Sequence, residues 1–87
     1  MYITDVLIEE RIKEKILDKH NVSATEIKAV LLNKPCALRA RKNRYMAIGR
    51  HNRFITVIFT MRKTIAFIIT AYPSSDAQIK LYKSKRS

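Results

Sequence analysis

The chain has 87 residues, of which 47% are hydrophobic, with one glycine, two prolines and a single cysteine, Cys36. That length fits one small domain, and the apolar fraction is that of a globular protein rather than a disordered one. No apolar run approaches the ~20 residues of a membrane helix, and the N-terminus lacks the basic-then-apolar build of a signal peptide. We therefore expect one soluble, cytoplasmic domain over residues 1–87, with no membrane partner, metal or small-molecule cofactor, and with Cys36 as a small buried residue.

The net charge of +11 is concentrated in one part of the sequence. Residues 1–36 contain six Lys or Arg and six Asp or Glu, whereas residues 37–87 contain twelve Lys or Arg and one acid, Asp76. Such an asymmetry creates a positive potential that attracts polyanions and releases counterions when phosphates bind. Charge alone does not separate RNA, DNA, anionic lipid and an acidic protein as the partner.

Two short helices are predicted for the first 36 residues. Isoleucines recur every four residues after Thr4, which can cap the first helix, and Asn21 can end it. The residues SATE at 23–26 form a capping box, in which the Ser hydroxyl accepts a backbone N–H and the Glu reaches back. The second helix is short and ends before Pro35.

From residue 37 onward the apolar period changes to two, which predicts four strands joined by short turns into an antiparallel meander. A second capping box, SDAQ at 75–78, opens a closing helix that runs to about Lys83. The predicted fold is α+β, with two N-terminal helices, a four-stranded antiparallel sheet and a short C-terminal helix. The sheet face expected to pack against the helices carries Ile55, Val57, Phe59, Ile65, Phe67 and Ile69.

The sequence has no Gly-rich phosphate loop, no paired carboxylates and no metal-spaced set of His, Cys and Asp. Its His, Tyr, Lys and Arg residues suffice for metal-independent cleavage of RNA by the neighbouring 2′-OH. In that reaction a base removes the hydroxyl proton, cations stabilise the phosphorane, and an acid protonates the leaving 5′ oxygen. The candidate proton carriers are His20, His51, Tyr72 and Tyr82, and the candidate charge stabilisers are Arg44, Arg50, Arg53 and Arg62.

Each candidate also has a structural alternative. A cationic His20 at a helix end favours the helix dipole, and His51 can be a plain turn residue. Tyr82 can be a packing aromatic, and Arg44 and Arg53 can be strand-end charges that discourage edge pairing. The spacing of these residues alone does not identify an enzyme.

The order of several short motifs is informative: KHNVSATEI (19–27), RYMAIGR (44–50), FITVIFT (54–60), FIITAY (67–72) and then Tyr82. This order resembles the BrnT-type toxins of bacterial toxin–antitoxin operons, which belong to the RelE-like group of small ribonucleases. Lys19 and His20 match the Lys-His pair that ends the first helix of those toxins, and Arg44 and Gly49 match an Arg and a small-Gly step. Two positions depart from the pattern, because Phe67 and Tyr72 stand where the toxins commonly have arginines.

The resemblance implies a RelE/BrnT-like ribonuclease that blocks translation, with a cognate antitoxin as its protein partner and mRNA, free or on the ribosome, as its RNA partner. For catalysis we expect His20, Arg44, Tyr72 and Tyr82. For RNA binding we expect Arg39, Arg41, Lys42, Arg50, His51, Arg53, Arg62 and Lys80. The alternatives are a non-catalytic nucleic-acid-binding module that uses the same basic sheet face, and a basic interaction protein with an acidic protein partner.

Overall fold

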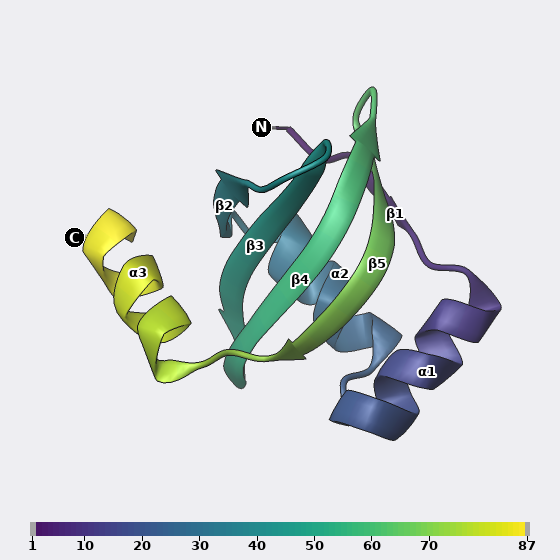
Figure 1. Ribbon diagram of the computed structural model, residues 1–87, viewed down its shortest axis with the longest axis horizontal. Helices are drawn as coiled ribbons and strands as arrows, with labels where there is room; N and C mark the ends of the chain where they lie inside the picture. Colours follow the sequence, from purple (N-terminus) through teal and green to yellow (C-terminus); the bar gives the residue numbers. More distant parts are fainter. Residues whose placement is uncertain (1, 87) are drawn as a thin grey trace.

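A five-stranded mixed sheet forms the centre of the computed structural model, which describes residues 2–86 (Figure 1). Met1 and Ser87 of the expected domain lie outside the described residues. The strand order is β1-β5-β4-β3-β2, in which β2 to β5 form the expected antiparallel meander and β1 runs parallel to β5. The elements are β1 (Asp5–Leu7), α1 (Glu10–His20), α2 (Ala24–Leu32), β2 (Cys36–Arg39), β3 (Arg44–His51), β4 (Arg53–Arg62), β5 (Ile65–Pro73) and α3 (Asp76–Arg86). The α+β class and the three helices are confirmed, and the sheet has one strand more than expected.

The additional strand, β1, replaces the expected beginning of the first helix. The backbone N–H of Thr4 donates to the carbonyl of Thr64 (2.9 Å), and the two threonine hydroxyls are 2.6 Å apart. Val6 pairs with Ala66 and is 4% exposed, whereas α1 begins only at Glu10. The predicted cap at Thr4 is therefore wrong, because pairing with a strand sixty residues away is a tertiary contact that local periodicity does not reveal.

The predicted stop of α1 and the predicted caps of α2 and α3 are confirmed, whereas α3 runs to Arg86 rather than to about Lys83. Asn21 adopts a left-handed conformation (φ 55°), and its N–H donates to the carbonyl of Leu17 at 3.0 Å, which ends α1. The capping box of α2 is complete: the N–H of Glu26 donates to the Ser23 hydroxyl (3.2 Å), and the N–H of Ser23 donates to the Glu26 carboxylate (3.2 Å). The reciprocal pair at 75–78 caps α3 in the same way.

One sheet face packs against α2, and its β4 residues are the expected ones. Ile55, Val57 and Phe59 are fully buried. The expectation for β5 is wrong, since the residues buried on this face are Ala66, Ile68 and Ala71 rather than Ile65, Phe67 and Ile69. The turn at residues 63–64 pairs Arg62 with Ile65, and a register shift beside Ile58 and Phe59 then leaves Ile69 without a partner. A one-residue change of register moves every side chain to the other face.

The opposite face, which we call the open face, is covered in part by α3, mainly beside β2 and β3 (Figure 1). Cys36 and Ile48 pair across these two strands and are buried, which confirms the expectation for Cys36. The rest of the open face is part apolar and part polar. It carries Arg44, Met46 and Arg50 from β3, Phe54, Thr56, Ile58, Thr60 and Arg62 from β4, and Phe67, Thr70 and Tyr72 from β5.

Gly49 allows α2 to lie close to β3. A Cβ atom at this position would be 2.8 Å from Cγ1 of Val30 and 3.5 Å from both the Val30 carbonyl oxygen and Cβ of Pro35. The glycine is therefore required by the helix–sheet distance, and its backbone has no positive φ.

We expect Gly49→Ala to lower the free energy of unfolding by about 1–3 kcal/mol, because the added methyl group overlaps Val30. The measurement is urea unfolding of the four members of a double-mutant cycle with Val30→Ala. The cost of Gly49→Ala should be smaller in the Val30→Ala background, and equal costs in both backgrounds would contradict the assigned contact.

Candidate active site

The ends of α1 and β5 bring His20 and Tyr72 together, and we call these two residues the His–Tyr pair. His20 is the last residue of α1, and Tyr72 is the penultimate residue of β5. Their ring centroids are 5.9 Å apart with the ring planes at 56°, and both side chains are half-buried. The structure thus places two of the four predicted catalytic residues side by side, although they are far apart in the sequence.

The hydroxyl of Tyr72 is held by Gln78, from the first turns of α3. The Gln78 amide donates from Nε2 to the Tyr72 hydroxyl (3.1 Å), while Oε1 accepts from the Thr56 hydroxyl and from the Ser75 N–H (both 2.9 Å). Thr56 is fully buried and also bonds the Ser74 hydroxyl (2.7 Å). The sequence indicates Gln78 only as a helix cap. The cap uses the amide oxygen of Gln78, so the capping pattern does not show that the NH₂ group points to Tyr72.

Tyr82 lies one helical turn after Gln78 and packs edge-on against Phe54, with ring centroids 5.3 Å apart. The guanidinium of Arg50 lies over the ring of Phe54, with its central carbon 5.4 Å from the ring centroid. Arg50, Phe54 and Tyr82 therefore form a cationic and aromatic cluster. It shares the end of the open face with the His–Tyr pair, since Phe54 and Thr56 follow each other on that face of β4 and Thr56 pairs with Tyr72.

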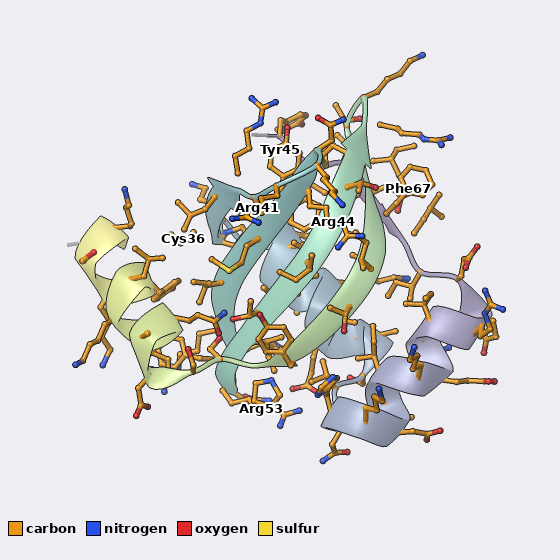
Figure 2. All side chains as sticks on the ribbon, in the orientation of Figure 1. Cys36, Arg41, Arg44, Tyr45, Arg53 and Phe67 are labelled. Atoms are coloured by element: carbon orange, nitrogen blue, oxygen red, sulfur yellow. The ribbon has the colours of Figure 1, made fainter. Side chains whose placement is uncertain are left out.

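Arg44 lies at the other end of the open face, near Arg41 (Figure 2), Lys42 and Arg62; we call these four residues the arginine end. Arg44 pairs with Thr60, four residues along β4 from the partner of Tyr72, which corresponds to about 13 Å of strand. Arg41, Lys42 and Arg44 border a shallow hollow of about 440 Å³. The structure therefore does not bring Arg44 to the His–Tyr pair.

Three other predicted RNA-binding residues are exposed but dispersed. Arg39 pairs with Tyr45, whose ring stacks on the core residue Phe59, so Arg39 lies on the face opposite to that of Arg44. His51 is the last residue of β3 and pairs with Arg53, rather than lying in the turn as expected, and Lys80 lies on α3.

Arg53 has a structural contact that the sequence did not indicate. Its guanidinium makes a two-pronged ion pair with Glu26, from Nε to Oε2 (2.9 Å) and from Nη2 to Oε1 (3.1 Å), and Nη2 also donates to the carbonyl of Asn21. The hydrogen bond from Arg53 lowers the pKa of Glu26, and the same bond raises the pKa of Arg53. Because Asn21 directly follows His20, this contact fixes the end of α1 that carries the catalytic candidate.

Within residues 2–86, no three His, Cys, Asp or Glu side chains lie close enough together to hold a metal ion. No helix in the same part of the chain has the length and apolar character needed to cross a membrane.

Three small helices on a five-stranded mixed sheet, with the His–Tyr pair where α1 meets β5, form a small α+β fold. The particular fold is that of the BrnT-type toxins. The crystal structure of the Brucella abortus ribonuclease toxin BrnT is similar to this chain with a TM-score of 0.70, covering 84% of this chain and 99% of that one at 20% sequence identity. No protein-family model and no curated protein sequence matches the chain. The likeness confirms at the level of the fold the resemblance found in the short motifs.

The ion pair of Glu26 predicts an acid-sensitive component of stability. Because the folded-state pKa of Glu26 lies below its ordinary value of 4.5, the pair stabilises the fold fully above that value, and the stabilisation is lost as the pH falls through the lowered folded pKa. We expect a loss of about 0.5–1 kcal/mol for this partly exposed pair. The measurement is urea unfolding of the wild type and of Glu26→Gln at about pH 6 and about pH 3. The component is the difference between the two proteins in how much their free energy of unfolding changes between these pH values.

The control is Glu14→Gln, because Glu14 is exposed on α1. An equal pH dependence in the wild type and in Glu26→Gln would refute the assignment.

Proposed function

We propose that this protein is the toxin of a toxin–antitoxin system and that it is a metal-independent endoribonuclease. The observation that carries the proposal is the proximity of the His20 and Tyr72 rings, whose centroids are 5.9 Å apart, on a fold similar to that of a ribonuclease toxin. Two side chains that can exchange protons meet there, in a chain whose charge of +11 attracts RNA.

The proposed reaction is an attack of the RNA 2′ oxygen on the adjacent phosphorus. The bond from phosphorus to O2′ forms, the bond to O5′ breaks, and the products are a 2′,3′-cyclic phosphate and a 5′-hydroxyl. We assign the general base to His20, because imidazole is the side chain that changes charge near neutral pH. We assign the general acid to Tyr72, which gives its proton to the leaving O5′.

The hydrogen bond from Gln78 supports the assignment of Tyr72 as the acid. Its amide donates to the phenolic oxygen at 3.1 Å, so the phenolic proton remains available for the leaving oxygen. The same donor stabilises the phenolate that forms when this proton leaves. Gln78 is thus a positioning residue that acts through Tyr72.

The remaining basic residues are proposed to bind the RNA away from the cleaved bond. Arg44 moves in this proposal from catalysis to binding, with the other residues of the arginine end. Arg62 has its guanidinium carbon 5.4 Å from the ring centroid of Phe67, which supports the proposal that Arg62 substitutes for the arginine that BrnT-type toxins commonly have at position 67. The cluster of Arg50, Phe54 and Tyr82 offers an aromatic and cationic surface on which an unpaired base can stack.

The proposed protein partner is a cognate antitoxin with an acidic or amphipathic segment that covers the basic open face. Covering that face would block RNA binding by burial and by charge neutralisation. The proposed consequence of RNA cleavage is inhibition of translation, with mRNA, free or on the ribosome, as the substrate.

Expression of the chain without the neighbouring small gene should stop growth and degrade RNA, and expression with that gene should restore growth. His20→Ala and Tyr72→Phe should each abolish the growth defect, because each removes one proton carrier. With purified protein, each variant should slow cleavage of labelled RNA by about 100-fold or more while the RNA affinity is retained. Tyr2→Phe is the matched control, since it removes a phenolic hydroxyl from a side chain that is 75% exposed.

A gel shift by the wild type without any cyclic-phosphate product would refute the nuclease proposal. That result would favour the alternative of a non-catalytic RNA-binding module on the same open face.

Gln78→Glu tests the positioning of Tyr72 separately from helix stability. A glutamate keeps the oxygen that caps α3 but replaces the amide donor by an acceptor, so that Tyr72 must donate its own proton to residue 78. We expect single-turnover cleavage to slow by about 10-fold or more, with a changed pH profile and little change in melting temperature or RNA affinity. In the Tyr72→Phe background the substitution should have no further effect, and an equal further loss there would contradict the role.

A further inference from the structure

The charges of α1 are separated in space, on a helix with four Lys or Arg and three Asp or Glu. Basic side chains recur at every fourth residue along one stripe of the helix, and acidic side chains recur in the same way along another. The basic stripe consists of Arg11, Lys15 and Lys19, and the acidic stripe consists of Glu10, Glu14 and Asp18. The net charge of residues 1–36, which is zero, therefore conceals a helix with one positive side.

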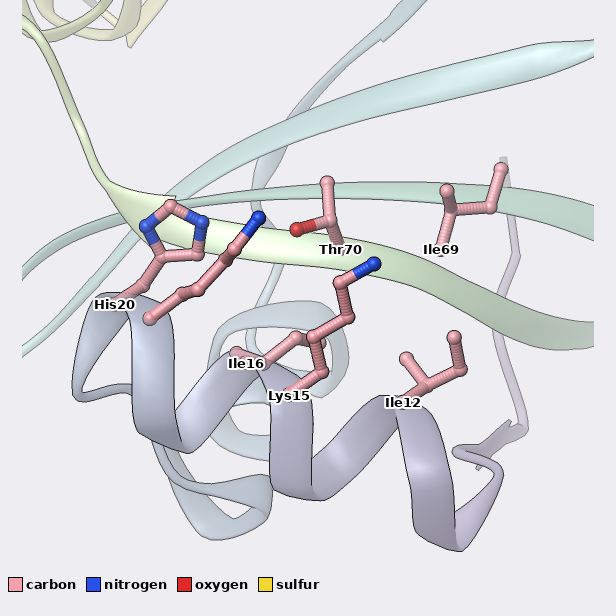
Figure 3. Close-up of a pocket in the computed structure, with 7 residues that line it drawn as sticks. Ile12, Lys15, Ile16, His20, Ile69 and Thr70 are labelled. Carbon is pink, nitrogen blue, oxygen red and sulfur yellow. The ribbon is translucent and has the colours of Figure 1, made fainter.

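The positive side of α1 borders a groove between this helix and β5, with a volume of about 280 Å³ (Figure 3). Its apolar lining consists of Ile12, Ile16 and Ile69, and its polar lining consists of Lys15, Lys19, His20 and Thr70. Among the residues that the structure describes, no acidic side chain lines it. In Figure 3 the polar groups of Lys15, His20 and Thr70 face the same space between the helix and the strand.

The topology of the sheet explains why a groove lies here. β1 pairs with β5 only at residues 65–67, so within residues 2–86 the second half of β5 has a strand, β4, on one side only, and α1 lies along its other side. Ile69 is the residue left without a partner by the register shift between β4 and β5. Such irregularities redirect side chains at the edges of sheets.

The lysines of this groove are available for a ligand. Lys13, on the same helix, lies 4.0 Å from Glu10, whereas no ion pair within residues 2–86 involves Lys15 or Lys19. Two ammonium groups, a hydroxyl and an imidazole that meet without a carboxylate supply hydrogen-bond donors and positive charge, which suit phosphate oxygens.

We propose that the groove between α1 and β5 binds RNA phosphates through Lys15, Lys19 and Thr70, and that the isoleucine floor contacts the sugar or base between them. His20 belongs both to this groove and to the His–Tyr pair, so the bound nucleotides adjoin the cleaved bond; this placement rests on the proposed nuclease function. From the His–Tyr pair the RNA strand then runs along α1. This helix lies on the opposite side of β5 from β4 and the arginine end.

The test compares two double variants that remove the same charge. Lys15→Ala with Lys19→Ala removes the lysines of the groove, and Lys13→Ala with Lys28→Ala removes two exposed lysines outside it. The probe is a fluorescein-labelled, 2′-O-methylated RNA of about ten nucleotides, which binds but cannot be cleaved because it lacks the attacking hydroxyl. For the groove variant we expect about 10-fold weaker binding and a salt slope reduced by about 1.4, at ~0.7 for each phosphate of a single strand that the protein no longer neutralises.

Equal weakening by the two double variants, at equal melting temperatures, would overturn the proposal, because the charge would then act diffusely. So would unchanged RNA binding by the groove variant combined with a loss of binding to polyglutamate, which would assign the groove to an acidic protein partner.

The outcome is independent of the nuclease proposal. If the wild type leaves ordinary RNA intact but only the groove variant loses affinity for the methylated RNA, the groove stands and the nuclease proposal fails. If the wild type cleaves RNA and both double variants bind alike, the nuclease proposal stands and the groove fails.

Discussion

The contact of Arg53 with Glu26 and Asn21 joins three elements on which the candidate site depends. It ties the first residue of β4 to the capping box of α2 and to the residue that ends α1. The two helices are connected by only three residues, so their directions are set where this guanidinium lies. His20 precedes Asn21, and the position of its ring opposite Tyr72 therefore depends on an ion pair that itself has no place in the proposed chemistry.

The local part of the fold could be predicted from the sequence, because its determinants lie within a few residues. Both capping boxes, the stop at Asn21 and the four meander strands are determined in this way. The errors concern contacts between distant residues. β1 depends on a partner sixty positions away, and the faces of β5 depend on a turn register and on one unpaired residue, neither of which changes the apolar pattern.

The candidate site shows the same division. His20 and Tyr72 could be named as candidates from their residue types, but the sequence could not show which of the proton carriers would meet. Residue type and resemblance group Arg44 with His20 and Tyr72. The strand register separates them, because Arg44 pairs with Thr60, which is four residues along β4 from Thr56, the partner of Tyr72. The hydrogen bond from Gln78 to Tyr72 and the groove beside the basic stripe of α1 could not be predicted either, because each requires knowledge of which element a given helix face contacts.

The parallel pairing of β1 with β5 has a consequence for the order of folding. During synthesis from the N-terminus, β1 and α1 leave the ribosome well before β5, the strand against which both of them pack. Neither can complete its contacts until residues 65–73 follow, and contacts of such long sequence separation slow folding. Tyr72 lies in this late segment, and Gln78 lies just after it. The N-terminal half of the nascent chain therefore carries His20 without its partner, and the basic surface of the later strands emerges before the proposed catalytic pair can assemble.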